Sequence, residues 1–124
     1  MSKKLDLWKE GKYVDLWTIP HVIFGGISMF IFSYLGLNLL LNFLISVFIM
    51  VFWEFFELYF LGVKEHLPNK VMDVVTGIIG FGIMYYLART YELSSLWIYF
   101  WIMLVVWLAL NFLGLYASRK RNKK

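Results

Sequence analysis

The sequence predicts an all-α membrane protein, a bundle of four transmembrane helices with both termini in the cytoplasm. Hydrophobic residues make up 61% of its 124 residues and charged residues only 16%, whereas soluble domains are about half apolar and a quarter charged. The apolar residues fall into four runs, each close to the length that crosses a bilayer. Lys and Arg gather in the connections on one side of these runs, and this asymmetry sets the orientation.

The four membrane spans are expected at about residues 17–35, 37–62, 71–88 and 94–117, which together form one membrane domain at 17–117. Pro20 suits the first turn of the first helix, and Gly36 and Asn38 mark an uncharged turn after it. Residues 62–70 are the polar internal connection, in which Asn69 is predicted to cap the third helix.

The two ends of the chain are predicted to lie at the membrane surface. Residues 1–16 form either an amphipathic segment at the lipid headgroups or a flexible, solvated leader broken at Gly11. Asp15 or Thr18 can cap the helix that follows. Residues 118–124 form a basic tail beside anionic lipids. The N-terminal residues lack the short apolar core and the small-residue cleavage site of a cleaved signal peptide, so no cleaved signal is expected there.

Charge placement gives the orientation and one class of partner. Eleven of the twelve Lys and Arg residues fall on one side of the predicted spans, and Arg89 alone falls on the other. The positive side is therefore expected to face the cytoplasm. The lipid bilayer and its anionic headgroups account for the net charge of +4 and the pI of about 9.3, so that no nucleic-acid partner is needed.

Small residues on two of the predicted helices indicate close helix packing. Gly25 and Ser28 share a face of the first span, and Gly77 and Gly80 share a face of the third. Small side chains allow two helix backbones to approach closely within a membrane. We therefore expect these four residues to form a contact between helices.

A group of polar residues is predicted to meet in the inner half of the membrane: His21, Glu54, Glu57, Asn69 and Asp73. Glu54 and Glu57 are the only formal charges in residues 37–62, and an acid within hydrocarbon costs about 2.5–3.5 kcal/mol. At 100° per residue, Glu57 shares a face with Asn42 and Ser46, whereas Glu54 lies at the edge of that face. This pattern predicts that Glu57 points into the bundle.

Three interpretations of this polar cluster remain open. The first is an ion-pair and hydrogen-bond cluster that fixes helix packing, with Lys12, Lys64, Lys70 and protonated His21 as the neutralising charges. Residue by residue, this interpretation is favoured.

The second interpretation is a metal or metal-dependent catalytic site. His21 with Glu54, Glu57 and Asp73 suits Zn, Mn or Fe, whereas the three carboxylates with Asn69 suit Mg or Ca. No His-Glu-x-x-His signature is present, and the absence of cysteine excludes thiolate sites and disulfides. The third interpretation is proton-coupled transport, which with four spans would require a homo-oligomer.

An ordered pattern of motifs resembles a known group of bacterial membrane proteins. His21 opens the first span, Trp53-Glu54-x-x-Glu57 closes the second, and Asn69-x-x-x-Asp73-x-x-x-Gly77-x-x-Gly80 opens the third. Over residues 15–88 this pattern resembles the VanZ-like group and the related inner-membrane proteins of the YjdF type. VanZ-like proteins are expected to have glutamine after the tryptophan-glutamate pair and asparagine after the aspartate. Glu57 and Asn69 depart from that pattern and favour the YjdF-like side.

The resemblance implies a cell-envelope role, associated in the VanZ group with low-level teicoplanin tolerance, more than it implies a reaction. The expected function is therefore that of a small multi-pass protein of the VanZ-like type with an inner-leaflet polar site. The alternatives are a metal-dependent membrane enzyme that acts on a lipid or lipid-linked substrate and an oligomeric proton-coupled transporter. Whether the site is catalytic is open.

Overall fold

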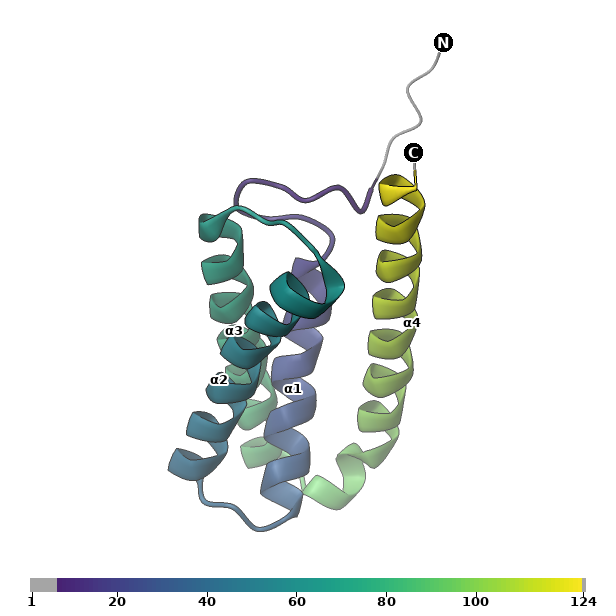
Figure 1. The fold of residues 1–124 in the computed structure, drawn as a ribbon. Helices are drawn as coiled ribbons and strands as arrows, with labels where there is room; N and C mark the ends of the chain where they lie inside the picture. The colour runs from purple at the N-terminus through teal and green to yellow at the C-terminus, as the bar shows by residue number, and fades with distance from the viewer. Residues whose placement is uncertain (1–6, 124) are drawn as a thin grey trace.

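The structure is a computed structural model and describes residues 7–123. All regular secondary structure in this range is helical (Figure 1). The helices of this described part are α1 (Thr18–Tyr34), α2 (Leu39–Phe56), α3 (Leu67–Thr90) and α4 (Trp97–Asn122). A π-helical turn, η1 (Glu57–Leu61), extends α2, and a 3-10 turn, η2 (Leu93–Leu96), leads into α4. The all-helical prediction is confirmed.

Among the described residues, three helical segments are long and apolar enough to cross a membrane: Leu39–Leu61, Leu67–Thr90 and Leu93–Asn122. The helix α1 is a shorter apolar helix of 17 residues. Large apolar side chains also cover the outside of the bundle, and Phe48 and Phe112 are more than 70% exposed. A water-soluble protein rarely leaves so much apolar surface uncovered, so this is a helical membrane protein.

Two helix boundaries differ from those expected. The helix α3 begins at Leu67, not Val71, because Pro68 fits the first turn of a helix, where no backbone N–H is needed. Asn69 therefore lies inside α3 and is not its cap, so that prediction is wrong. At the other end, α4 continues through Asn122 into the predicted tail, with basic residues in its last turn, where the helix dipole favours them.

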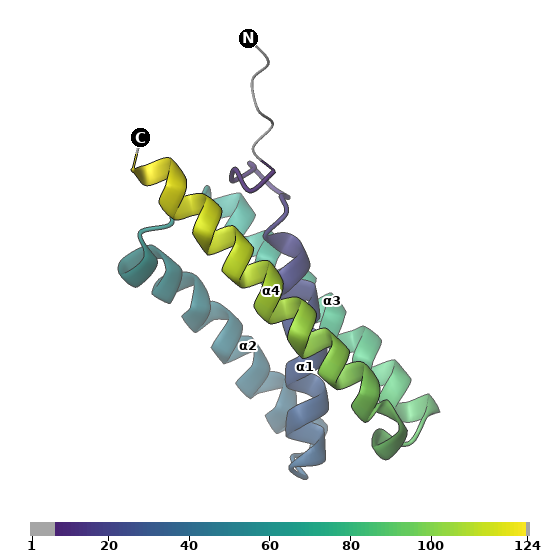
Figure 2. The same ribbon diagram turned by 90° about the vertical axis from the view of Figure 1, so that its right-hand side faces the viewer.

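The helix α1 is the centre of the bundle, with α2 and α3 on one side and α4 on the other (Figures 1 and 2). Its closest neighbour is α3, which runs parallel to it. A methyl group added at Gly25 would lie 1.8 Å from the Gly77 carbonyl oxygen, and one at Gly80 would lie 1.9 Å from the Val22 carbonyl oxygen. The two backbones are therefore in direct contact along this glycine seam. Ser28, also buried, donates a hydrogen bond to the Gly25 carbonyl within α1.

One end of the bundle holds an apolar core and a small polar network. The core consists of Ile27, Met29, Phe30, Phe81, Met84, Leu96 and Phe100. Beside it lies an amide–hydroxyl cluster formed by Ser33, Asn42 and Ser46. The Asn42 amide donates to the Met29 carbonyl and to the Ser33 hydroxyl at 2.9 Å each, and Ser46 donates to Asn42 at 3.2 Å.

The other end holds the N-terminal segment, the 62–66 connection and the last turns of α4 (Figure 1). Residues 7–16 form turns and bends, not an amphipathic helix. Asp15 stabilises the conformation of this segment, because its carboxylate accepts hydrogen bonds from the Gly11 and Trp17 backbone N–H groups. The Lys3, Lys4 and Lys124 positions used in the predicted charge asymmetry lie outside the described residues.

A candidate metal site at the end of an apolar cavity

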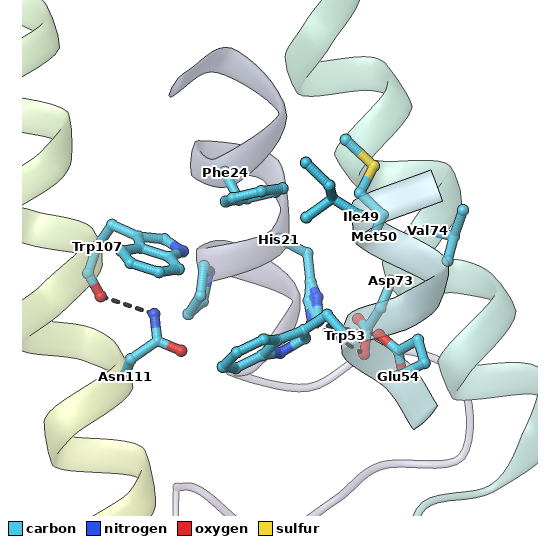
Figure 3. Close-up of a pocket in the computed structure, with 11 residues that line it drawn as sticks. His21, Phe24, Ile49, Met50, Trp53, Glu54, Asp73, Val74, Trp107 and Asn111 are labelled. Carbon is cyan, nitrogen blue, oxygen red and sulfur yellow. Dashed lines mark hydrogen bonds and ion pairs between the residues drawn. The ribbon is translucent and has the colours of Figure 1, made fainter. Parts of the chain in front are cut away.

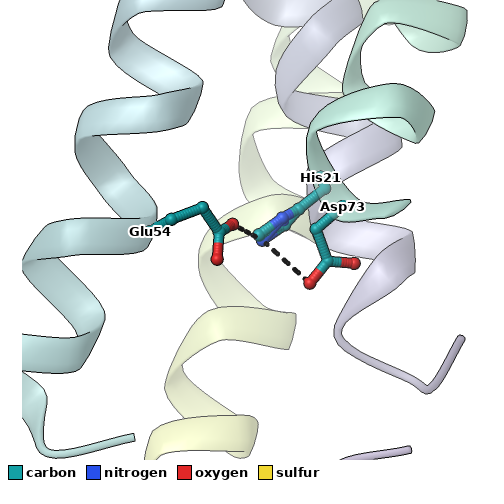
Figure 4. A group of neighbouring side chains, drawn as sticks. All are labelled: His21, Glu54 and Asp73. Carbon is teal, nitrogen blue, oxygen red and sulfur yellow. Dashed lines mark ion pairs between the residues drawn. The ribbon is translucent and has the colours of Figure 1, made fainter. Parts of the chain in front are cut away.

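Three helices bring an imidazole and two carboxylates together in the interior (Figure 4). His21 Nε2 from α1 lies 3.5 Å from Glu54 Oε1 of α2 and 3.9 Å from Asp73 Oδ2 of α3. Asp73 is 1% exposed and Glu54 7% exposed. We call these residues the carboxylate–histidine cluster; one ligand atom from each lies within 4.8 Å of the other two.

The glycine seam places His21 against Asp73. The His21 backbone carbonyl lies against Gly77, one helical turn along α3 from Asp73. Thr18, one turn before His21, donates its hydroxyl to Asp73 Oδ1 at 3.2 Å. This bond orients the carboxylate, with its second oxygen, Oδ2, directed towards the imidazole.

Several oxygens of this region have no hydrogen-bond partner. Asp73 Oδ2, Glu54 Oε2, Glu65 Oε2 and Asn69 Oδ1 are buried and accept no hydrogen bond from any described residue. Buried polar atoms are normally satisfied, and a buried carboxylate without a partner is especially costly. Three of these four oxygens belong to carboxylates, and protons or a cation would complete them.

The carboxylates of Glu57 and Glu65 lie next to Glu54. Glu57 is 4% exposed, and its Oε1 accepts a 2.6 Å hydrogen bond from the Trp53 indole. The π-helical turn ends at Gly62, whose φ of 65° reverses the chain, and the connection then returns Glu65 towards α2. Ligand oxygens of Glu54, Glu57 and Glu65, the three-glutamate group, lie within 4.8 Å of one another.

Glu65 lies in the 62–66 connection, outside the membrane-spanning helices. Burial raises the pKa of its carboxyl to about 8, and the nearby carboxylates of Glu57 and Asp73 contribute to the rise. Without a cation, this carboxyl therefore keeps its proton at neutral pH.

An apolar cavity of about 260 Å³ ends at the carboxylate–histidine cluster (Figure 3). Its walls come from α1, α2, α3 and α4 and include Phe24, Ile49, Trp53 and Trp107. Asn111 is a polar lining residue on α4, and its amide donates to the Trp107 carbonyl at 2.8 Å. The cavity thus joins an apolar space to a charged site.

The structure unites some of the residues singled out from the sequence and separates others. His21, Glu54 and Asp73 are in contact, with Glu57 adjacent. Asn69 is directed elsewhere, because its amide donates to Asp15 at 2.8 Å. Both glutamates are buried. Glu57 lies on the inward face where it was expected, whereas Glu54, which was expected at the edge of that face, is buried as well and is the one that contacts His21.

Sequence reasoning missed three contributors to the site. Asp15 and Thr18 were expected only as helix caps, and Glu65 was expected only as part of a polar connection. All three belong to the side of the membrane where the cluster was expected, and this shared side was the available signal. The predicted neutralising lysines, Lys12, Lys64 and Lys70, form no ion pair with the cluster; within the described residues its ion pairs are those of His21.

Comparison of the chain with models of protein families, with curated proteins and with solved structures finds no match.

Proposed function

We propose that this chain is a four-span protein of the cell (inner) membrane, VanZ-like in type, with a role in the cell envelope. In this proposal the carboxylate–histidine cluster binds a divalent metal ion, and the ion recognises the phosphate of a lipid or lipid-linked substrate. The observation that carries the proposal is the convergence of His21, Glu54 and Asp73 from three helices, with two buried oxygens that accept no hydrogen bond from the described residues.

The arrangement of the helices supports four spans with both termini in the cytoplasm. The shorter helix α1 runs parallel to α3 in direct backbone contact, and α3 is long enough to cross a membrane. A helix of 17 residues extends about 26 Å, close to the thickness of the hydrocarbon layer. Lys9 and Lys12 precede α1, and Arg119, Lys120 and Arg121 end α4, at the same end of the bundle (Figure 1). This placement supports a cytoplasmic location for that end.

The ligand set supports a metal ion with an open coordination position. Ligands about 2.1 Å from a tetrahedral ion lie roughly 3.4 Å from one another, and the His21–Glu54 separation is 3.5 Å. One imidazole and two carboxylates suit Zn²⁺ or Mn²⁺. Three protein ligands leave a position for a substrate oxygen, as in catalytic zinc sites. The Thr18 hydroxyl supplies the outer hydrogen bond that typically orients a ligating carboxylate.

The cavity supports a lipid substrate. Its volume of about 260 Å³ lies just below the usual range for small-molecule pockets, roughly 300–1,000 Å³. The cavity therefore suits one end of a lipid hydrocarbon chain better than a whole lipid molecule. Aromatic and aliphatic walls accept hydrocarbon, while a cation bound at the cluster would attract a phosphate. An apolar space for the hydrocarbon of a lipid phosphoester would thus lie beside a cation for its phosphate.

Metal content tests the first part of the proposal. Protein purified in detergent is stripped with a chelator, reloaded with Zn²⁺ or Mn²⁺ and assayed for bound metal and thermal stability. Wild type is expected to bind metal stoichiometrically, and His21→Ala is expected to lose at least 100-fold in affinity, because an imidazole ligand is removed. His66→Ala is the matched control, since His66 is exposed and precedes α3.

Absence of bound metal in wild type, or equal losses in the two histidine variants, would contradict the metal site. The lipid part is tested in nanodiscs with and without phosphatidic acid. Retention of this lipid is expected to require the metal, and retention that is unchanged by the chelator would contradict a role for the ion in lipid recognition.

A further inference from the structure

We infer that the site is built for two divalent ions bridged by Glu54, with the second ion held by Glu54, Glu57 and Glu65. This inference rests on the proposed function and deepens it. Two groups of potential ligands share one residue: the carboxylate–histidine cluster and the three-glutamate group both include Glu54. No other residue belongs to both of these groups.

Glu54 has the geometry of a bridging carboxylate. Its Oε1 lies 3.5 Å from His21 Nε2, on the side of the first ion. Its Oε2 is buried and has no hydrogen-bond partner among the described residues. A carboxylate with one oxygen committed to each of two ions holds them at the spacing of two-metal sites, about 3.5–4 Å.

The three-glutamate group also contains carboxylate oxygens whose hydrogen bonding is incomplete. Glu65 Oε2 is buried and unpartnered, as Glu54 Oε2 is, and Glu57 is 4% exposed. Trp53 fixes the Glu57 carboxylate through its indole N–H. The three carboxylates are therefore gathered and only partly satisfied, and a cation would complete them.

The local backbone explains how Glu65 reaches the group. The π-helical turn at Glu57–Leu61 and the left-handed Gly62 end α2 abruptly, and the Val63 N–H bonds back to the Glu57 carbonyl at 3.1 Å. Glu65 is thereby turned towards the residues that precede η1. Segments of π-helix are frequent at functional sites.

Charge favours two ions over one. Four carboxylates (Glu54, Glu57, Glu65 and Asp73) surround the two positions, so two divalent ions would balance the formal charge of their ionised forms. All-carboxylate ligands suit hard ions, and the mixed His–carboxylate set tolerates Mn²⁺. Mn²⁺ is therefore the ion that fits both positions. The ligand class that such a pair takes is a phosphoester, whose oxygens can bridge the two ions.

Manganese loading tests the bridge. Chelator-stripped protein is titrated with Mn²⁺, bound metal is counted, and the electron paramagnetic resonance spectrum is recorded. Wild type is expected to bind two ions with an exchange-coupled spectrum. Glu65→Gln is expected to bind one ion with an uncoupled six-line spectrum, and Glu57→Gln, a second route to the same position, should behave alike. Glu92→Gln, an exposed position in the 91–96 connection, should match wild type.

The possible failures are distinguishable. Wild type that binds one uncoupled Mn²⁺, unchanged in both glutamine variants, overturns the second position and leaves the proposed function standing. Wild type that binds two ions without coupling overturns the bridge. Wild type that binds no Mn²⁺ or Zn²⁺ overturns the proposed function together with this inference.

Discussion

Two polar clusters lie along the interior face of α2, and they differ in how completely their polar atoms are hydrogen-bonded. In the amide–hydroxyl cluster, Asn42 and Ser46 are fully buried, and each is hydrogen-bonded. In the carboxylate–histidine cluster, Glu54 and Asp73 are nearly as buried, yet each keeps one oxygen that accepts no hydrogen bond from the described residues. Burial alone therefore does not separate the two clusters, whereas hydrogen-bond satisfaction does.

The difference supports the proposal that the amide–hydroxyl cluster serves folding and that the carboxylate–histidine cluster binds a ligand. Neutral amides and hydroxyls can complete their hydrogen bonds with neighbouring helices, and each such bond contributes about 1 kcal/mol. Carboxylates that face one another cannot do so, because none of them is a donor when ionised. The hydrogen bonds of the first cluster are complete within the described residues, whereas in our proposal a bound metal ion completes the second.

The largest expected effect concerns the glycine seam, on which the carboxylate–histidine cluster depends because the seam holds Asp73 of α3 against α1. Gly80→Ala is expected to lower the free energy of unfolding by about 3 kcal/mol, since its methyl group would collide with the Val22 backbone carbonyl. Denaturation in mixed micelles measures the loss. Gly82→Ala is the matched control on the same helix, because nothing lies within 4 Å of its added carbon. Equal stabilities of the two variants would contradict the close α1–α3 contact.

A pair of substitutions separates the two clusters by their response to metal. At a metal concentration 100 times the dissociation constant, wild type should gain about 2.7 kcal/mol of stability. Glu54→Gln should lose this gain, because it removes a ligand of the proposed site. In chelator the same variant should be at least as stable as wild type, since one buried carboxylate is gone. Thermal melting with and without metal measures both effects.

Asn42→Ala should show the opposite pattern. It removes donors to the Met29 carbonyl and to Ser33, so it should cost about 2 kcal/mol, equally with and without metal. Its metal-induced gain should equal that of wild type. If Glu54→Gln instead lowered stability in chelator as Asn42→Ala does, both clusters would be structural.

The sequence predicted the helices and the membrane setting because both depend on local composition. It also predicted that His21, Glu54 and Asp73 would meet, because the charge asymmetry placed these residues at one depth. That argument needed only the order of the spans and the side of each connection, so errors of a few residues in helix boundaries did not affect it.

The rest depended on contacts that helical periodicity cannot express. The start of α3 at Leu67 follows from Pro68 and moved Asn69 from a cap to a partner of Asp15. Glu65 reaches Glu54 only because a π-helical turn and Gly62 redirect the chain. A helical wheel assumes an unbroken 3.6-residue repeat, so it carries no information beyond the point where that repeat ends.

The smallest expected effect sharpens the contrast through pH. In chelator, the amide–hydroxyl cluster has no group to titrate, whereas burial raises the pKa of Glu65 from 4.5 to about 8. Between these values the folded protein holds a proton that the unfolded chain releases, so the free energy of unfolding falls as pH rises from about 5 to about 8 and this contribution then levels off. Glu65→Gln keeps a neutral side chain at every pH, so its stability relative to wild type should grow over that interval. Melting curves from pH 5 to 9 measure the difference, with Glu92→Gln reporting the loss of one exposed carboxylate. If the difference in stability between Glu65→Gln and wild type stayed constant with pH, Glu65 would be charged in the folded protein. A cationic group of the chain would then compensate the three-glutamate group, and no bound cation would be needed there.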